Sequence, residues 1–274
     1  MTSTVTTLGS GETSLALRAW PPPAEPRASM LIVHGIGEHS GRYEHVGEFF
    51  TEAGFAVHAF DLPGFGRSGG RRAHVESFDL FLDVVEERLA AVGLGDRPTV
   101  LYGHSMGGLI ALAYCLSQRR PPDLAVLSAP ALDANVPAWQ RKGAPLLGRI
   151  VPKLPVASPI DGDQLSHDPA VGEAYFADPL VVTSTTAALG SELFATMDAT
   201  RPRIGRLTVP TYVFHGGADT LVPPQFSVPL QDVAAVTRRL WPSLRHEAHN
   251  EPEYREVLGE VLAWLDRRLA GLPD

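Results

Sequence analysis

The chain has 274 residues, of which 44% are hydrophobic and 20% charged, so its composition is that of a folded globular protein and excludes a disordered one. The formal net charge of −8 argues against nucleic acid as a partner, because no basic surface is available to displace counterions from phosphates. Cys115 is the single cysteine, which excludes an intramolecular disulfide and fits a reducing compartment.

The start of the sequence, MTSTVTTLGSGETS, is polar and lacks the cationic segment and apolar run of a secretory signal. No run in the sequence reaches the ~20 apolar residues that a membrane span requires. We therefore expect a cytoplasmic protein.

Strand and helix signals alternate along most of the chain. Residues 4–19 alternate around a Gly9-Ser10-Gly11 turn and predict two antiparallel strands. The remaining strands are expected at 30–33, 55–60, 98–102, 125–128, 211–214 and 239–241, and the helices at 42–53, 78–92, 106–116, 225–236 and 254–269. This alternation predicts an α/β fold with a mostly parallel sheet and helices on both faces.

Residues 131–207 interrupt the alternation, because they hold many prolines and short apolar clusters but no strand of the core type. We interpret them as a cap, or lid, inserted between two strands of the sheet. The core would then comprise residues 1–130 and 208–274.

A G-x-S-x-G motif, residues 103–107, lies between the strand expected at 98–102 and the helix expected at 106–116. A serine at such a strand-to-helix turn has a strained backbone, and its hydroxyl projects clear of the sheet edge. Ser105 is therefore a candidate nucleophile. A serine hydroxyl needs a base within hydrogen-bond reach, and a histidine base needs an acid that fixes its tautomer.

Two later strand ends supply an acid and a base. Asp219 follows the strand at 211–214, and His246 follows the strand at 239–241. The ends of parallel strands meet at one sheet edge, which brings these side chains toward Ser105. Taken alone, Asp219 could be a turn former after two glycines, and spacing does not separate His246 from His249. The order Ser, Asp, His at three strand ends nevertheless predicts a triad.

Two backbone N–H groups are candidates for an oxyanion hole, in which each donor contributes ~3–4 kcal/mol. One belongs to Met106, directly after the serine. The other belongs to Ile36, in the loop that follows the strand at 30–33. The alternative is that Gly35 and Gly37 only form a tight turn, and both can be true.

Two further sequence patterns resemble binding motifs, one for a dinucleotide and one for zinc, but neither fully fits its motif. Residues 64–69 match G-x-G-x-x-G, but the match does not open directly into a helix as a dinucleotide-binding turn does. His246 and His249 are three residues apart rather than four, and Pro252 forbids the helix that a zincin motif requires. The sequence therefore predicts neither nucleotide nor metal.

Six motifs spread over nearly the whole chain outside the cap carry a family likeness: HGIGEHSGRY (34–43), DLPGFGRSGG (61–70), GHSMGG (103–108), LSAPAL (127–132), HGGADTLVP (215–223) and RHEAHNEPE (245–253). Together they resemble the monoacylglycerol lipase group of the α/β-hydrolase superfamily. The resemblance implies an α/β-hydrolase fold with an inserted cap.

For the site, the resemblance implies Ser105 as nucleophile, Asp219 as acid and His246, rather than His249, as base. It also implies an oxyanion hole formed by the N–H groups of Ile36 and Met106. His104 would be structural and pack beside the serine turn.

In lipases of this group, polar residues that match Glu38, Arg42 and His249 hold the glycerol end of the substrate. The alternative for Glu38 and Arg42 is a local salt bridge that holds the oxyanion loop.

The implied function is hydrolysis of a monoacylglycerol, or a similar small lipid ester, through an acyl-enzyme and without a metal or organic cofactor. The alternatives on the same scaffold are a carboxylesterase and a lysophospholipase. A further alternative is a ligand-binding protein without turnover, but such chains commonly lack a member of the triad, and all three residues are present here.

The cap contains an apolar stretch with basic residues between its members: Trp139, Leu146, Leu147, Ile150, Val151 and Leu154, with Arg141, Lys142, Arg149 and Lys153. This composition suits a segment that lies on a membrane or micelle surface while walling an acyl tunnel. Ordinary packing of a lid helix on the core fits it equally.

Overall fold

A twisted sheet of eight strands forms the centre of the molecule, in the order β1-β2-β4-β3-β5-β6-β9-β10. The computed structural model describes residues 2–21, 25–93, 97–157 and 160–271. Strands β1 and β2 run antiparallel to their neighbours, and every other pair in this sheet is parallel. The strands are β1 (Thr4–Leu8), β2 (Leu15–Trp20), β3 (Ala28–Val33), β4 (Phe55–Phe60), β5 (Thr99–His104), β6 (Leu124–Ser128), β9 (Thr211–Gly216) and β10 (Val236–Trp241).

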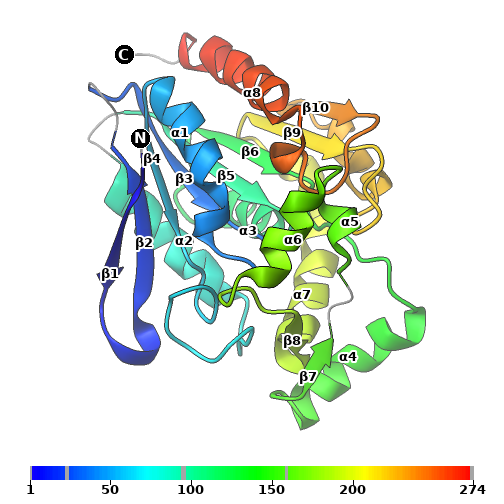
Figure 1. Ribbon diagram of the computed structural model, residues 1–274. Helices are drawn as coiled ribbons and strands as arrows, with labels where there is room; N and C mark the ends of the chain where they lie inside the picture. Colours follow the sequence, from blue (N-terminus) through cyan, green and yellow to red (C-terminus); the bar gives the residue numbers. More distant parts are fainter. Residues whose placement is uncertain (1, 22–24, 94–96, 158–159, 272–274) are drawn as a thin grey trace.

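Helices cover both faces of the sheet (Figure 1). One hydrophobic cluster includes residues of α1 and α8, and the other includes residues of α2, α3 and α7. The α-helices are α1 (Glu44–Glu52), α2 (Asp79–Val92), α3 (Met106–Cys115), α4 (Ala138–Ile150), α5 (Gly162–Leu165), α6 (Pro169–Ala177), α7 (Ala187–Thr200) and α8 (Tyr254–Leu269). Short 3-10 helices occupy Gly11–Thr13, Ser40–Tyr43, Arg201–Arg206, Pro224–Asp232 and Ala248–Asn250.

The predicted fold class is confirmed, and the long periodic helices were the most accurately bounded. Helix α8 buries Val257, Leu258, Val261, Trp264 and Leu265, the spacing of a single apolar face. Its bounds, Tyr254–Leu269, are those expected from the sequence.

The helix expected at 225–236 is wrong. A 3-10 helix spans Pro224–Asp232, with Pro229 inside it, and strand β10 already begins at Val236. Proline has no N–H to donate and clashes with the preceding turn, so these residues do not continue as a regular α-helix. Val236 instead pairs with Thr211 at the edge of the sheet.

The segment 131–207 lies between β6 and β9, which are neighbours in the sheet. Its two short strands, β7 (Pro155–Ala157) and β8 (Ser184–Thr186), pair with each other in a separate sheet. Helix α4 extends away from the main sheet (Figure 1). It rests on α7 at Gly148, where a Cβ would lie 2.7 Å from Cβ of Ser191.

Several apolar side chains of this segment are exposed, namely Trp139, Leu146, Leu147, Ile150, Val151 and Leu154. No residue of α4 is buried. Across the described parts of the chain, no helix is long and apolar enough to span a bilayer.

Candidate active site

Ser105 lies between β5 and α3 with φ of 53° and ψ of −115°. The left-handed region is strained for a residue with a Cβ, so surrounding contacts must hold the turn. The Ser105 N–H donates to the carbonyl of Ser128 at 2.9 Å, and its carbonyl accepts from the N–H groups of Leu109 and Ala131, each at 3.0 Å. These bonds attach the turn to the end of β6 and to the first turn of α3.

Glycines on both sides of Ser105 permit the close approach of strand and helix. A Cβ on Gly103 would overlap the carbonyl oxygen of Gly107, and a Cβ on Gly107 would overlap the carbonyl oxygen of Val33. Both obstacles are backbone atoms that cannot move aside, so only glycine fits at these positions.

Gly107→Ala is therefore expected to lower the free energy of unfolding by about 1–3 kcal/mol, the cost of overpacking. Gly190→Ala is the matched control, because Gly190 is also helical and a Cβ there meets nothing within 4 Å. That variant should be stabilised by up to about 1 kcal/mol. Urea unfolding of both variants measures the difference, and equal stabilities would contradict the packing described here.

Asp219 and His246 form a buried pair, with 2.7 Å between Oδ2 of Asp219 and Nδ1 of His246. Oδ1 of Asp219 accepts from the backbone N–H groups of Leu221 and Val222, each at 2.9 Å. Burial favours the neutral acid, but the adjacent imidazole of His246 outweighs it and holds the pKa of Asp219 well below its usual range. The ionised carboxylate therefore accepts the Nδ1–H of His246.

The same contact acts on the histidine. Burial disfavours the imidazolium, yet the Asp219 carboxylate outweighs burial and raises the pKa of His246 above its ordinary value. With its proton on Nδ1, neutral His246 has a free lone pair on Nε2. Its ring centroid lies 4.7 Å from that of His104, the residue before Ser105.

The loop after β3 touches the serine turn. A Cβ on Gly35 would lie 3.3 Å from Cβ of Ser105, so the backbone of this loop passes directly beside the serine. His34 attaches the loop to the segment after β4. Its Nε2 accepts from the N–H of Leu62 at 2.9 Å, and its Nδ1 lies 2.7 Å from the Gly35 carbonyl oxygen. Ile36 and Met106 thus lie on the two segments that meet at Ser105.

Glu38 and Arg42 belong to a buried ion-pair network that also contains Glu247. Arg42 donates from Nη1 to Glu38 at 2.6 Å and pairs with both carboxylate oxygens of Glu247 at 2.6 and 2.7 Å. Glu38 also accepts from the N–H of Gly35 at 2.6 Å and the hydroxyl of Tyr43 at 2.7 Å. The network joins the loop after β3 to Glu247, the residue after His246, and contains the Glu38–Arg42 salt bridge of the alternative interpretation. A role in holding glycerol stays a prediction.

The His249 ring is stacked on Tyr43 at a centroid distance of 5.1 Å, and its centroid lies 4.6 Å from that of His104. Burial, and then the neighbouring His104, hold the pKa of His249 well below its usual range. Burial likewise lowers the pKa of His104 to about 3, and Nδ1 of His104 lies 3.0 Å from Oγ of Ser128. Both rings are therefore neutral, and His104 packs beside the serine turn as expected.

Comparison with known proteins places this geometry in a family. Residues 24–253 match the family model described as serine aminopeptidase, S33. A monoacylglycerol lipase of Mycolicibacterium smegmatis is 36% identical over 266 residues, covering 94% of each chain. The chain belongs to this α/β-hydrolase family, in its monoacylglycerol lipase group.

Two further relatives extend the comparison. The crystal structure of a Paleococcus ferrophilus monoacylglycerol lipase matches with a TM-score of 0.83 and 30% identity, covering 98% of this chain and 100% of that one. The phospholipase YtpA of Bacillus subtilis is 32% identical over 251 residues, covering 88% of this chain and 96% of that protein. As a member of the monoacylglycerol lipase group, the chain is a carboxylic ester hydrolase.

In this member of the lipase group, the segment 131–207 is hydrogen-bonded to the loop after β3 and to the loop of His246. The N–H of Val182 donates to the Gly37 carbonyl at 2.7 Å. The N–H groups of His246 and Glu247 donate to the carbonyls of Gln164 and Leu165 at 3.3 and 2.9 Å. Val182 therefore supports the loop after β3, and Gln164 and Leu165 support the His246 loop, while α4 packs on α7.

The loop of His246 is also held by Glu251, which the sequence analysis did not single out. Its carboxylate accepts from the N–H of Arg245 at 2.7 Å, the N–H of His167 at 2.7 Å and the hydroxyl of Ser166 at 3.0 Å. Ser166 and His167 lie 85 and 84 residues from Glu251 along the chain, and no local pattern reveals contacts at that separation.

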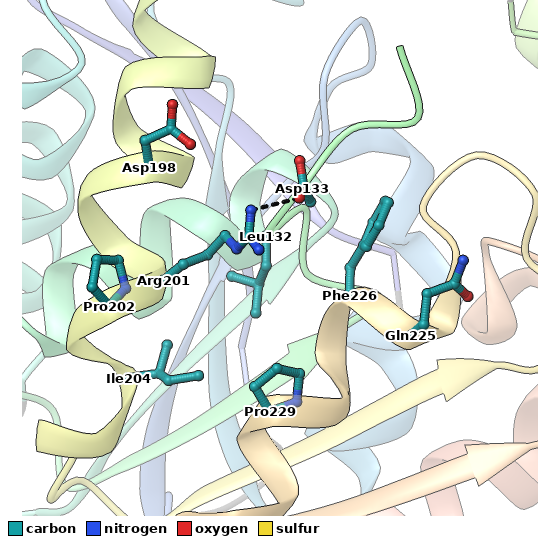
Figure 2. Close-up of a pocket in the computed structure, with 9 residues that line it drawn as sticks. All are labelled: Leu132, Asp133, Asp198, Arg201, Pro202, Ile204, Gln225, Phe226 and Pro229. Atoms are coloured by element: carbon teal, nitrogen blue, oxygen red, sulfur yellow. Dashed lines mark hydrogen bonds and ion pairs between the residues drawn. The ribbon is translucent and has the colours of Figure 1, made fainter. Parts of the chain in front are cut away.

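A pocket of about 500 Å³ lies between the two ends of the segment 131–207 and the 3-10 helix Pro224–Asp232 (Figure 2). Arg201 reaches across it to Asp133, with 2.6 Å between Nη1 and Oδ2. Its lining residues come from the two ends of the segment 131–207 and from the 3-10 helix after Asp219: Leu132, Asp133, Asp198, Arg201, Pro202, Ile204, Gln225, Phe226 and Pro229. The pocket is thus built from residues other than the predicted site residues.

The glycine-rich stretch 64–69 forms a closed turn after β4. The N–H of Gly64 donates to the Gly69 carbonyl at 2.7 Å, and helix α2 begins only at Asp79. This geometry differs from a dinucleotide-binding turn, which opens directly into a helix.

Proposed function

We propose that this chain hydrolyses monoacylglycerols with Ser105 as nucleophile, His246 as base and Asp219 as acid. The observation that carries the proposal is the buried 2.7 Å hydrogen bond between Asp219 and His246, next to the strained turn of Ser105. The lipase relatives support the substrate class.

In the proposed reaction, Oγ of Ser105 attacks the ester carbonyl while Nε2 of His246 takes its proton. The N–H groups of Ile36 and Met106 stabilise the oxyanion of the tetrahedral intermediate. As the intermediate collapses, the C–O bond to glycerol breaks and His246 gives the proton to the leaving glycerol oxygen. A water molecule then attacks the acyl carbonyl while His246 takes its proton. The bond to Oγ of Ser105 breaks, His246 returns the proton to Oγ, and the fatty acid is released.

The segment 131–207 would act as the cap over the acyl chain. Glu38, Arg42 and His249 would face the glycerol end. Because Glu38 and Arg42 are already paired with each other and with Glu247, we expect their larger effect to be on the position of the oxyanion loop.

A second candidate is hydrolysis of a lysophospholipid, favoured by the similarity to the phospholipase YtpA. A short-chain carboxylesterase is the third. All three reactions would use the same triad, so the triad does not discriminate among them.

The test is a substrate panel on the purified chain, comparing monoacylglycerols of several chain lengths, a triacylglycerol, a lysophospholipid and a nitrophenyl acetate. The proposal predicts the highest kcat/KM for a monoacylglycerol. A higher value for the lysophospholipid would replace it with the second candidate, and a higher value for nitrophenyl acetate with the third. Absence of hydrolysis of every ester would refute all three.

We further propose that α4 contacts the lipid surface from which the substrate is taken. Its exposed apolar residues are interspersed along the sequence with Lys142 and Arg149, and Lys153 follows the helix. These cationic side chains complement an anionic bilayer. Leu146→Asp combined with Leu147→Asp should reduce partition into vesicles of anionic phospholipid at least about fivefold. Sedimentation with vesicles measures this. Unchanged partition would favour simple packing of α4 on α7.

A further inference from the structure

His215 is a buried imidazole that the proposed reaction does not use. It lies in β9, four residues before Asp219, and is fully buried. Its Nε2 is 3.1 Å from Oδ2 of Asp219, the same oxygen that lies 2.7 Å from Nδ1 of His246. Two imidazoles therefore meet at one carboxylate oxygen.

The neighbours of Nε2 decide where the proton of His215 lies. Besides Asp219, the carbonyl oxygen of Val222 lies 2.7 Å from Nε2. A carbonyl and an ionised carboxylate only accept hydrogen bonds, so Nε2 carries a hydrogen and donates.

The opposite side of the ring is held as firmly. Nδ1 of His215 lies 2.9 Å from Oγ of Ser227, which also accepts from Nε of Arg238 at 3.1 Å. Oγ of Ser227 is 3.0 Å from the carbonyl of Pro224, so its hydrogen can point either to that carbonyl or to Nδ1. The contact of Nδ1 with Ser227 thus holds the ring with Nε2 toward Asp219.

We propose that His215 is a positioning residue. Its Nε2–H donates to Oδ2 of Asp219 and holds the carboxylate in place, so that His215 and His246 share the negative charge of this carboxylate. The inference rests on the proposed function, since it assigns His215 a role in the same triad.

The proposal predicts the direction in which the base responds when the second donor is lost. With one donor fewer on Oδ2, more of the carboxylate charge falls on His246, and the pKa of His246 rises. The remaining groups that act on His246 are Glu247, Glu38 and the ring of His104, and Arg238 acts on His215 through Ser227. A substitution of His215 leaves all four in the chain.

His215→Asn and His215→Gln form a matched pair. The asparagine amide reaches only as far as Nδ1 and retains the contact with Ser227, whereas the longer glutamine reaches the position of Nε2 and places an N–H near Asp219. We measure kcat/KM for a nitrophenyl ester against pH, because its acid limb reports the pKa of the base in the free enzyme. The limb should shift upward by about one pH unit in His215→Asn, the size expected for one hydrogen bond to a charged group. In His215→Gln it should stay near that of the wild type.

His58→Asn is the control, because His58 is a partly buried strand histidine on β4, remote from the triad. Its acid limb should not move. An unmoved limb in His215→Asn, or an equal shift in His58→Asn, would overturn the inference while leaving the proposed function intact. A wild type that hydrolyses no ester would refute the proposed function instead.

A measurement on the unaltered chain covers the case in which His215→Asn does not fold. NMR of ¹⁵N-labelled histidine should find Nε2 of His215 protonated across the pH range of activity. A His215 ring protonated at Nδ1 alone could not donate to Asp219, and this result would overturn the inference.

Discussion

Replacing Ser105 with alanine is expected to lower kcat for ester hydrolysis by about a million-fold, the loss seen when a serine hydrolase loses its nucleophile. The substitution removes only Oγ. The strained backbone of the turn, held by Ser128, Leu109 and Ala131, keeps its hydrogen bonds. Folding should therefore be unaffected, and thermal unfolding of the variant should match that of the wild type.

Ser117→Ala is the matched control for this loss. Ser117 lies just beyond the other end of α3, where its hydroxyl donates to the Tyr114 carbonyl at 2.7 Å. Stopped assays with a monoacylglycerol should find its kcat within about twofold of the wild type, as for a surface substitution away from the site. A Ser105→Ala variant that retains a tenth or more of the activity would mean that another residue attacks the ester.

Asp219→Asn is expected to lower kcat by about ten-thousand-fold, because it reverses the tautomer of the base. Oδ1 of Asp219 accepts two backbone N–H groups, from Leu221 and Val222, so the amide oxygen of asparagine must occupy that position. The amide NH₂ then faces Nδ1 of His246 and donates to it. His246 would carry its proton on Nε2, where it cannot accept the proton of Ser105.

Asp123→Asn controls for the loss of a carboxylate that accepts a backbone N–H. Oδ2 of Asp123 accepts from the N–H of Thr99 at 2.7 Å. Thr99 is the first residue of β5, whereas Ser105 follows the last residue of the same strand. Its kcat should change less than threefold. If Asp219→Asn lost less than tenfold in the same steady-state assay, the acid of the triad would have to be another residue.

The sequence predicted the parts of the fold that depend on local periodicity and on strand ends. Helix α8 and the strands around Ser105 were predicted because their apolar spacing is regular. Asp219 and His246 could be paired in advance because both follow parallel strands, and the carboxyl ends of such strands meet at one edge. The 3-10 helix at Pro224–Asp232 was missed because apolar spacing alone does not account for the prolines within it.

Contacts between distant buried polar groups could not be predicted in the same way. Arg42 was expected to reach glycerol or to pair locally with Glu38. Its bidentate ion pair is instead with Glu247, 205 residues away along the chain. His215 stood in the quoted motif HGGADTLVP without a role of its own, and only the structure shows its Nε2 at the carboxylate of Asp219. Such contacts follow from three-dimensional packing, which residue spacing does not encode.

The most direct test of the account is to label the purified chain with a fluorophosphonate and map the adduct by peptide mass spectrometry. We predict one phosphonylated residue, Ser105, with labelling that slows sharply in Asp219→Asn. An adduct on any other side chain, or labelling of Ser105→Ala at the wild-type rate, would contradict the central claim that Ser105 is the activated nucleophile.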